Sequence, residues 1–352
     1  MPTDPTAAPA GASPATRARS VGRQGSLAGA GPSAAITAPA AHGEELDRFL
    51  ADVLRGLSAP RKWTPPKWFY DERGCELYGR ITRLPEYYLT RTEAGILERN
   101  LPEIARAVGP GALVFEYGAG GGEKALRLLE ALDRPAGYLP VEMSAPALAA
   151  ARDEVEARFP ALPVRAVQAD FAEDFHLPAG GIPCARRLAF FPGSTIGNFD
   201  PEEARLLLAR MARHAGRGGR LVLGVDLAKD RETLERAYDD AEGVTAAFDL
   251  NLLARINREL SGDFRLEAFR HRARWDPVLG RVEMHLESLA AQVVHVAGQA
   301  FAFRAGETIH TENSYKWDTD AFDALAARAG WRAESTFTDE RSWFAVKVFA
   351  ID

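Results

Sequence analysis

The chain has 352 residues, which is enough for one large domain or two ordinary ones. Apolar residues make up 46% of it and charged residues 26%, a balance that allows a sizeable core. The formal net charge of −6 argues against a general nucleic-acid binder, because neutralising phosphates needs a basic surface. Two cysteines are too few for a disulfide framework, and no apolar run approaches the roughly 20 residues of a membrane helix. We therefore expect a cytoplasmic enzyme or binding protein, monomeric, with no nucleic-acid or membrane partner.

The first 42 residues are rich in Ala, Pro, Gly, Ser and Thr and contain almost no large apolar side chains. Such a segment buries too little surface to offset the entropy lost on ordering, so we predict a disordered tail. Its Arg- and Ala-rich, acid-poor start is also typical of a transit peptide, but it lacks a clear amphipathic face.

Beyond the tail, apolar residues recur at helical spacing over 44–57 and 92–108, the second helix being capped by Thr90 or Thr92. Short apolar runs then alternate with amphipathic segments. We predict strands over 112–117, 137–141, 164–169, 187–191 and 220–225, with helices over 124–132, 144–159 and 201–215. Two late runs, 331–338 and 343–351, are predicted as an antiparallel edge hairpin. This order predicts an α/β, Rossmann-like, mostly parallel sheet covered on both faces.

The alternation of strands and helices breaks between about 230 and 315. This part predicts a long helix over 232–260, followed by strand-like runs over 266–275, 281–289, 291–296 and 300–303. We therefore expect two domains after the tail. The Rossmann-like domain would comprise 93–228 and 316–352, and a second, α+β domain would comprise 43–92 and 229–315.

A glycine-rich turn, Glu116-Tyr117-Gly118-Ala119-Gly120-Gly121-Gly122, joins the first predicted strand of the sheet to the next helix. Such a turn lets backbone N–H groups approach a ligand at the positive end of a helix, and it serves NAD, FAD and S-adenosylmethionine alike. Two details favour S-adenosylmethionine. The glycines do not follow the dinucleotide G-x-G-x-x-G spacing, which disfavours a dehydrogenase, and Glu116 would repel a pyrophosphate but could hold the methionine ammonium or sulfonium side.

Acidic residues also follow the next two predicted strands. Glu142 lies about 20 residues past the loop, where a carboxylate can accept ribose hydroxyls. Asp170-Phe171 follows the third strand, where an acid can bond the adenine amine and a ring can cover the base. Each acid alone could cap a helix, and the loop alone could be a turn that binds nothing. Three acids at consecutive strand ends favour a cofactor site, because ligands bind at the carboxyl edge of such sheets.

Four further segments are long and unusual: Pro66-Lys67-Trp68-Phe69-Tyr70-Asp71-Glu72-Arg73-Gly74, 81–88, 191–199 and 311–316. With them the chain resembles the histidine Nα-methyltransferase family of ergothioneine biosynthesis, from about residue 43 to the end. The resemblance implies a class I S-adenosylmethionine methyltransferase domain and a substrate-binding domain. It also implies that the α-amine of L-histidine is methylated three times to give hercynine.

The resemblance also implies roles for individual residues. Those that would contact S-adenosylmethionine are Tyr70, Gly118, Lys124, Glu142, Asp170 and Phe171, beside Glu116 and Gly120 of the loop. The family commonly has Asp where this chain has Glu142. Asn198 and Tyr238 would hold the substrate carboxylate, Tyr87 would lie near the α-amine, where it could orient the amine or help deprotonate it, and Gly193 would let the backbone approach. Glu312 and Ser314 would bind the imidazole, with Met284 lining that pocket.

Several alternatives stay open. Tyr238 could be a surface tyrosine, Asn198 could form a turn with Gly197, and Glu312 could be a solvated charge on an edge strand. His271, His285, His295 and His310 have no metal-binding spacing, so we predict no metal site and expect ordinary surface or hydrogen-bonded histidines. The acceptor could also be another aromatic amino acid such as tryptophan, and a non-catalytic cofactor-sensing protein is the rival from another class.

Overall fold

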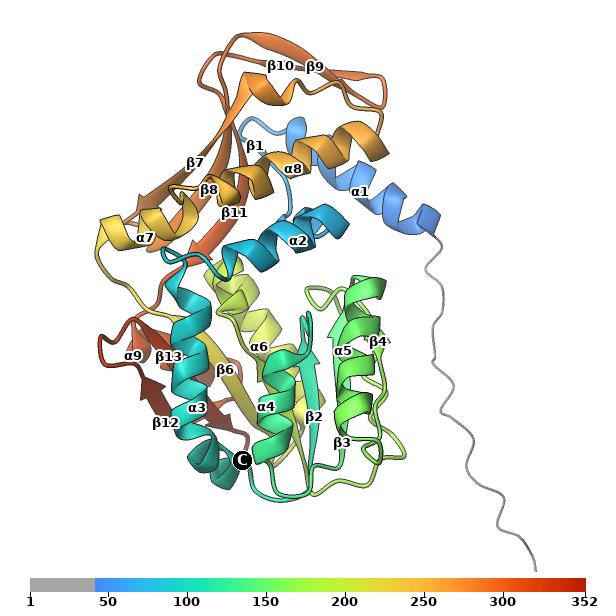
Figure 1. Ribbon diagram of the computed structural model, residues 1–352, viewed down its shortest axis with the longest axis vertical. Coiled ribbons are helices and arrows are strands. Elements are labelled where there is room, and N and C mark those ends of the chain that lie inside the picture. Colours follow the sequence, from blue (N-terminus) through green and yellow to red (C-terminus); the bar gives the residue numbers. More distant parts are fainter. Residues whose placement is uncertain (1–41) are drawn as a thin grey trace, which may run out of the picture. The chain divides into compact units, whose positions relative to one another are not determined.

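The computed structural model describes residues 42–352 (Figure 1). The predicted tail lies outside the described residues except for His42, with which helix α1 (His42–Leu57) begins.

The described residues form a larger sheet of seven strands in the order β12-β13-β6-β5-β2-β3-β4. These strands are β2 (Ala112–Tyr117), β3 (Gly137–Glu142), β4 (Val167–Gln168), β5 (Arg186–Phe191), β6 (Arg220–Asp226), β12 (Arg332–Thr338) and β13 (Phe344–Ala350). Strands β2 to β6 pair in parallel, while β13 runs antiparallel to both β6 and β12. The strand order reverses direction on either side of β2, as in doubly wound sheets. The predicted Rossmann-like fold class and the late edge hairpin are therefore confirmed.

Helices cover both faces of this sheet (Figure 1). One face packs against α3 (Tyr88–Val108), α4 (Glu123–Ala131) and α5 (Ala145–Arg158), and the other against α6 (Pro201–Ala215) and α9 (Thr319–Arg328). Successive side chains of a strand point to opposite faces of the sheet. On β2, Val114 therefore packs on the face covered by α3, α4 and α5, and its neighbours Leu113 and Phe115 pack on the face covered by α6 and α9.

A smaller sheet has the order β1-β11-β8-β7. Its strands are β1 (Lys62–Trp63), β7 (Phe269–Asp276), β8 (Arg281–Ser288) and β11 (Thr308–Tyr315). Helices α1, α2 (Glu72–Ile81), α7 (Arg231–Tyr238) and α8 (Val244–Glu259) belong to the same layer, with the hairpin of β9 (Gln292–Val296) and β10 (Gln299–Phe303) (Figure 1). Three short 3-10 helices are η1 (Pro66–Phe69), η2 (Thr195–Asn198) and η3 (Leu266–Ala268).

The core of this layer is continuous with the core under α3. Phe248, Met284 and Ile309 belong to the same cluster as Ile96 of α3. The larger and the smaller sheet are therefore joined by packed side chains. The proposed boundaries of the two domains remain a prediction.

Three expectations about single elements were wrong. The segment 232–260 is not one helix, because Gly243, at φ +71°, separates α7 from α8. Helix α3 begins at Tyr88, before the predicted start at 92, and it has no side-chain cap. Tyr88 and Leu89 are buried, so they add to the packed face of the helix at its N-terminal end. The strand predicted over 164–169 is reduced to β4 and a single bridge at Val164. Helix α2 and strand β11 were not predicted.

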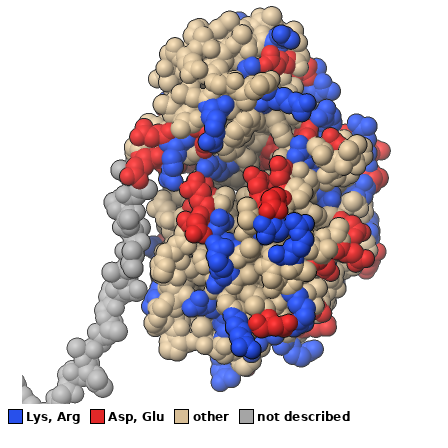
Figure 2. Space-filling model, turned by 180° about the vertical axis from the view of Figure 1, so that it is seen from behind, with Lys and Arg blue, Asp and Glu red and all other residues tan. Residues whose placement is uncertain are grey.

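No helix within residues 42–352 has the length and apolarity to cross a membrane. On the face shown in Figure 2, acidic and basic side chains are interspersed. Over the described part of that face, no broad basic surface of the kind that a phosphate backbone requires is seen.

Candidate active site

The glycine-rich turn forms a loop between β2 and α4. Gly118, Gly120 and Gly122 have φ values of +70°, +51° and +79°, a region that side chains other than glycine rarely adopt. A Cβ at Gly118 would lie 3.3 Å from the ring of Phe171, whereas one at Gly120 would meet nothing within 4 Å. The loop therefore closes against Phe171 on one side and stays open on the other.

Two of the predicted acids are fixed at adjacent strand ends. Glu142 accepts hydrogen bonds from the backbone N–H groups of Met143, at 2.8 Å, and Ser144, at 3.1 Å. Its second carboxylate oxygen faces the N–H of Gly120 at 3.4 Å. Asp170 accepts from the backbone of Ala172 at 2.9 Å and from the ammonium of Lys67 at 3.0 Å. Both carboxylates therefore lie at the carboxyl edge of the larger sheet.

Glu116 differs from these two acids because it is only 2% exposed. Its carboxyl accepts a hydrogen bond from the hydroxyl of Tyr138 on the neighbouring strand β3. Burial raises the pKa of Glu116 to about 8, so the group is largely uncharged at neutral pH. A contact between Glu116 and the cofactor stays a prediction.

Glu93 on α3 was not predicted, yet it joins three parts of the site. One carboxylate oxygen accepts from the backbone N–H of Gly193 at 2.7 Å, and the other accepts from the ammonium of Lys124 on α4. Burial alone would lower the pKa of Lys124, but the charge of Glu93 reverses this and raises it. A Cβ on Gly224 of β6 would lie 2.0 Å from the Glu93 carboxylate, which explains a glycine in the middle of that strand. Glu93 thus fixes both Lys124 and the loop after β5.

These groups fit S-adenosylmethionine. The loop offers backbone donors at the start of α4, where a carboxylate of the methionine part can bind. Glu142 and Asp170 offer acceptors at successive strand ends for ribose hydroxyls and an adenine amine. The ring of Phe171, partly buried against Tyr117 and Phe191, offers a flat apolar surface for the base.

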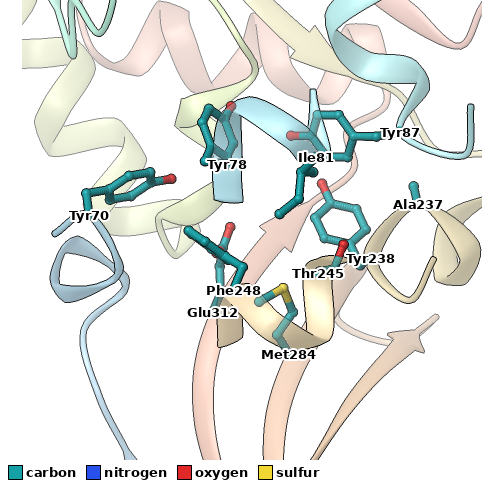
Figure 3. Close-up of a pocket in the computed structure, with 10 residues that line it drawn as sticks. All are labelled: Tyr70, Tyr78, Ile81, Tyr87, Ala237, Tyr238, Thr245, Phe248, Met284 and Glu312. Atoms are coloured by element: carbon teal, nitrogen blue, oxygen red, sulfur yellow. The ribbon is translucent and has the colours of Figure 1, made fainter. Parts of the chain in front are cut away.

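A pocket lies between the smaller sheet and helices α2, α7 and α8 (Figure 3). Its lining residues are Tyr70, Tyr78, Ile81, Tyr87, Ala237, Tyr238, Thr245, Phe248, Met284 and Glu312. The hydroxyl of Tyr70 and the carboxyl of Glu312 point into it from one side, and the hydroxyls of Tyr87 and Tyr238 approach from the other (Figure 3).

Half of this lining was predicted as substrate or cofactor contacts: Tyr70, Tyr87, Tyr238, Met284 and Glu312. The other half was missed: Tyr78, Ile81, Ala237, Thr245 and Phe248. They lie on α2, α7 and α8, and their spacing is that of ordinary packing residues on amphipathic helices.

Two alternatives raised by the sequence are wrong. Glu312 is not on an edge strand, because β11 lies between β1 and β8. Burial in the pocket, aided by the nearby carboxylate of Asp249, raises the pKa of Glu312 to about 8. Tyr238 is not a surface residue, since it is 5% exposed. The pocket therefore holds a carboxyl that can be neutral or charged near physiological pH.

A buried hydrogen-bond network continues from Tyr238 to the larger sheet. The Tyr238 hydroxyl lies 2.7 Å from that of Ser314, and the ammonium of Lys316 donates to both at 2.8 and 2.7 Å. Lys316 also pairs with Asp226 at 2.7 Å. Asp226, the last residue of β6, also pairs with Lys229 and accepts from the hydroxyl of Tyr88. Neither Lys316 nor Asp226 was predicted.

Asn198 and Gly193 do not line the pocket. Asn198 ends η2, and a Cβ on the preceding Gly197 would lie 2.9 Å from the carbonyl oxygen of Tyr315. Gly193 has φ +85°. Both residues thus follow β5, η2 packs against the end of β11, and the predicted contacts of Asn198 and Gly193 with substrate remain predictions.

The histidines are more organised than their spacing indicated. His271 is buried and bonded on both ring nitrogens, at 2.7 Å to Asp249 and 2.7 Å to the Tyr238 carbonyl. On the opposite face of the smaller sheet, His285 and His310 stack at 4.8 Å beside Glu283. Cross-strand pairing in the sheet brings these three together, which sequence spacing cannot show. Arg274 and Arg281 already pair with the Glu283 carboxylate, which disfavours a further cation there.

Over residues 49–351 the chain matches the family described as histidine-specific, S-adenosylmethionine-dependent methyltransferases. It belongs to that family. It is 45% identical to the histidine N-alpha-methyltransferase of Mycolicibacterium smegmatis over 84% of this chain and 93% of that relative. It is 42% identical to the histidine N-alpha-methyltransferase of Mycobacterium tuberculosis over 85% and 94%. Ergothioneine biosynthesis protein 1 of Neurospora crassa is 29% identical over 82% of this chain, but only 33% of that longer relative is covered.

Proposed function

We propose that this methyltransferase transfers methyl groups from S-adenosylmethionine to the α-amine of L-histidine. Three transfers would give hercynine, the trimethylated betaine of ergothioneine biosynthesis. The observation that carries the assignment of the acceptor is Glu312, a carboxyl enclosed in the pocket with a pKa raised to about 8 by burial. The names of the relatives indicate histidine as the acceptor, and the Glu312 carboxyl gives a physical reason why the pocket would bind it.

An imidazole ring presents one N–H donor and one nitrogen acceptor. A carboxyl with a pKa near that of the ring can pair with it either as acid and neutral ring or as carboxylate and imidazolium. In both forms the pair holds one shared proton. An apolar side chain in this place would leave Glu312 without a partner, which is costly in a buried site.

S-Adenosylmethionine supplies an electrophilic methyl group on a sulfonium. The residues of this chain then have to hold a neutral amine in line with that group. Burial raises the pKa of Tyr87 well above its usual range, so its hydroxyl stays protonated at physiological pH. Tyr87 therefore orients the amine through its oxygen and does not act as a phenolate base.

The walls of the pocket exclude water from the amine. Ile81, Phe248 and Met284 are apolar and line the same space as the tyrosine hydroxyls. In such an environment an amine is more easily held in its uncharged, nucleophilic form, because burial disfavours the ammonium. Each of the first two transfers leaves a methylated ammonium that releases one proton to solvent before the next transfer, and the third leaves a permanent trimethylammonium cation, which the aromatic faces of the pocket can accept.

The aromatic walls favour one rival acceptor. Tyr70, Tyr78 and Phe248 form an edge-to-face aromatic cluster that could flank an indole. An indole has a single N–H and no second ring nitrogen, so it would use Glu312 only as an acceptor. Histidine can both donate to the Glu312 carboxyl and accept from it, so we rank tryptophan as the second candidate acceptor.

Replacement of Glu312 tests the choice of acceptor. We expect Glu312→Ala to lower kcat/KM for L-histidine roughly 10- to 100-fold, the range expected for losing a hydrogen bond to a charged group. Glu287→Ala is the matched control, since Glu287 lies on the neighbouring strand β8 and pairs with the half-exposed Arg270 and Arg272 on the outer side. Steady-state kinetics with histidine and tryptophan measure the effect. Unchanged histidine kinetics in Glu312→Ala would contradict the proposal.

A further inference from the structure

We propose that Lys316 is a positioning residue of the substrate site. Its buried ammonium fixes the hydroxyls of Tyr238 and Ser314 and supplies the positive charge that the carboxylate of the amino-acid substrate neutralises. This inference rests on the proposed function and on the predicted contact between the substrate carboxylate and Tyr238.

The first support is the complete use of the Lys316 ammonium. Its side chain is 0% exposed, so no water compensates its charge from outside. An ammonium has three N–H donors, and the three partners at 2.7 to 2.8 Å are Asp226, Tyr238 and Ser314. Lys316 is therefore held in one position, and it fixes the hydroxyls of Tyr238 and Ser314.

The second support comes from counting the hydroxyl protons. Tyr238 and Ser314 each have one O–H, and the 2.7 Å contact between them uses one of the two. Because Lys316 can only donate, it occupies an acceptor position on both oxygens. Of the two oxygens, only that of Tyr238 lines the pocket. When Ser314 donates to Tyr238, the Tyr238 O–H has no partner among the described residues and can donate to an acceptor in the pocket, which suits a carboxylate oxygen.

The third support is the charge balance. Asp226 is the shared partner of Lys316 and Lys229, at 2.7 Å from each ammonium. All three side chains are at most 4% exposed. Burial lowers the pKa of Lys229 to about 8, so near neutral pH Lys229 is mostly but not fully charged. The two lysines together then exceed the single charge of Asp226, which is costly in a dry interior unless an anion completes it. A substrate carboxylate beside Tyr238 would be that anion.

The change Lys316→Met tests this role. It removes the ammonium but keeps a long apolar side chain, and it leaves Asp226 paired with Lys229, so no unpaired charge is created. Lys347→Met is the matched control, because Lys347 is also buried and pairs with Asp323 at 2.9 Å, but from β13 of the larger sheet. If Lys316→Met does not fold, Lys316→Gln, which is neutral and keeps hydrogen-bond donors, takes its place.

Calorimetry with L-histidine and with histamine, which lacks the carboxylate, separates positioning from a merely structural role. S-Adenosylhomocysteine is present throughout so that no methyl transfer occurs. We expect Lys316→Met to weaken histidine binding roughly 30-fold, as for the loss of one partner of a buried charge pair, and Lys347→Met to leave it unchanged. Histamine is itself cationic, so its binding stays the same or tightens.

One result would contradict the role of Lys316, and another would contradict the proposed function. If Lys316→Met keeps the wild-type preference for histidine over histamine, or loses both ligands in equal proportion, Lys316 has no role toward the carboxylate. If the wild-type protein itself has no preference for histidine over histamine, the proposed function fails, whatever the variant does.

Discussion

At the scale of single residues, the site depends on acidic side chains, partly or fully buried, that hold backbone or ammonium groups in place. Glu142 and Asp170 were selected because an acid follows a predicted strand, and both lie at the carboxyl edge of the sheet. The same signal applied to Asp226, which ends β6, but its role became visible only through its two lysine partners. Glu93 lies at helical spacing with Ile96 and Leu97. An acidic residue on the apolar face of a predicted helix is the sequence signal that could have identified Glu93 as a site residue.

Tyr87 carries a prediction at this scale. Its hydroxyl orients the substrate amine, so we expect Tyr87→Phe to lower kcat about tenfold, the upper range for one neutral hydrogen bond. The pH dependence of the rate should keep its shape, because burial raises the pKa of Tyr87 well above its usual range and the group does not titrate. Rates across pH measure both. A full rate at every pH would show that Tyr87 has no such role.

Among the elements, the most reliable predictions were those with strong periodicity. Helix α6 matches its predicted bounds, and β2 does as well, because apolar spacing and flanking turn residues agree there. Helix α2 was missed because Gly74 and Gly79 weaken its propensity. Strand β11 was missed because it reads Thr-Ile-His-Thr-Glu-Asn-Ser-Tyr, where polar residues face the pocket and a bulge falls between His310 and Glu312.

Helix α2 depends on its cap, which gives a prediction at the scale of elements. Asp71 accepts from the backbone N–H of Gly74 at 2.7 Å and also bonds Asn251 and Arg258 of α8. We expect Asp71→Ala to lower the free energy of unfolding by about 1–2 kcal/mol from the lost cap alone. Asp71→Asn keeps a capping oxygen and should lose less. Urea denaturation measures both changes, and an Asp71→Ala protein as stable as wild type would show that the cap is dispensable.

The whole molecule combines a sheet that the sequence predicts well with a layer that it predicts only in part. The doubly wound sheet follows from local alternation of strands and helices. The substrate layer is assembled from segments far apart in the chain, since β1 pairs with β11 across more than half of the sequence. Local periodicity contains no information on such pairing, so the pocket and its lysine network could not be derived from it.

Two buried carboxyls give the folded molecule a characteristic pH dependence. Burial raises the pKa of Glu116 and of Glu312 to about 8, above the ordinary value of 4.5 that an unfolded chain would show. Between these values the folded state holds protons that the unfolded state has released. The free energy of unfolding of the ligand-free protein should therefore fall as the pH rises from about 4.5 to 8.

Glu116→Gln isolates one of these groups, because the amide oxygen can still accept from Tyr138. We expect a shallower fall of stability across the same pH window in this variant, since its side chain does not titrate. Chemical denaturation at several pH values measures the slope. A slope equal to that of the wild type would mean that Glu116 is already ionised in the folded protein.

The central claim concerns the reaction itself. Purified protein is incubated with S-adenosylmethionine and each amino acid in turn, and the products are weighed by mass spectrometry. The account predicts additions of one, two and finally three methyl groups to L-histidine, with no such series on tryptophan. Methylation of another amino acid in preference to histidine, or no methylated product at all, would contradict it.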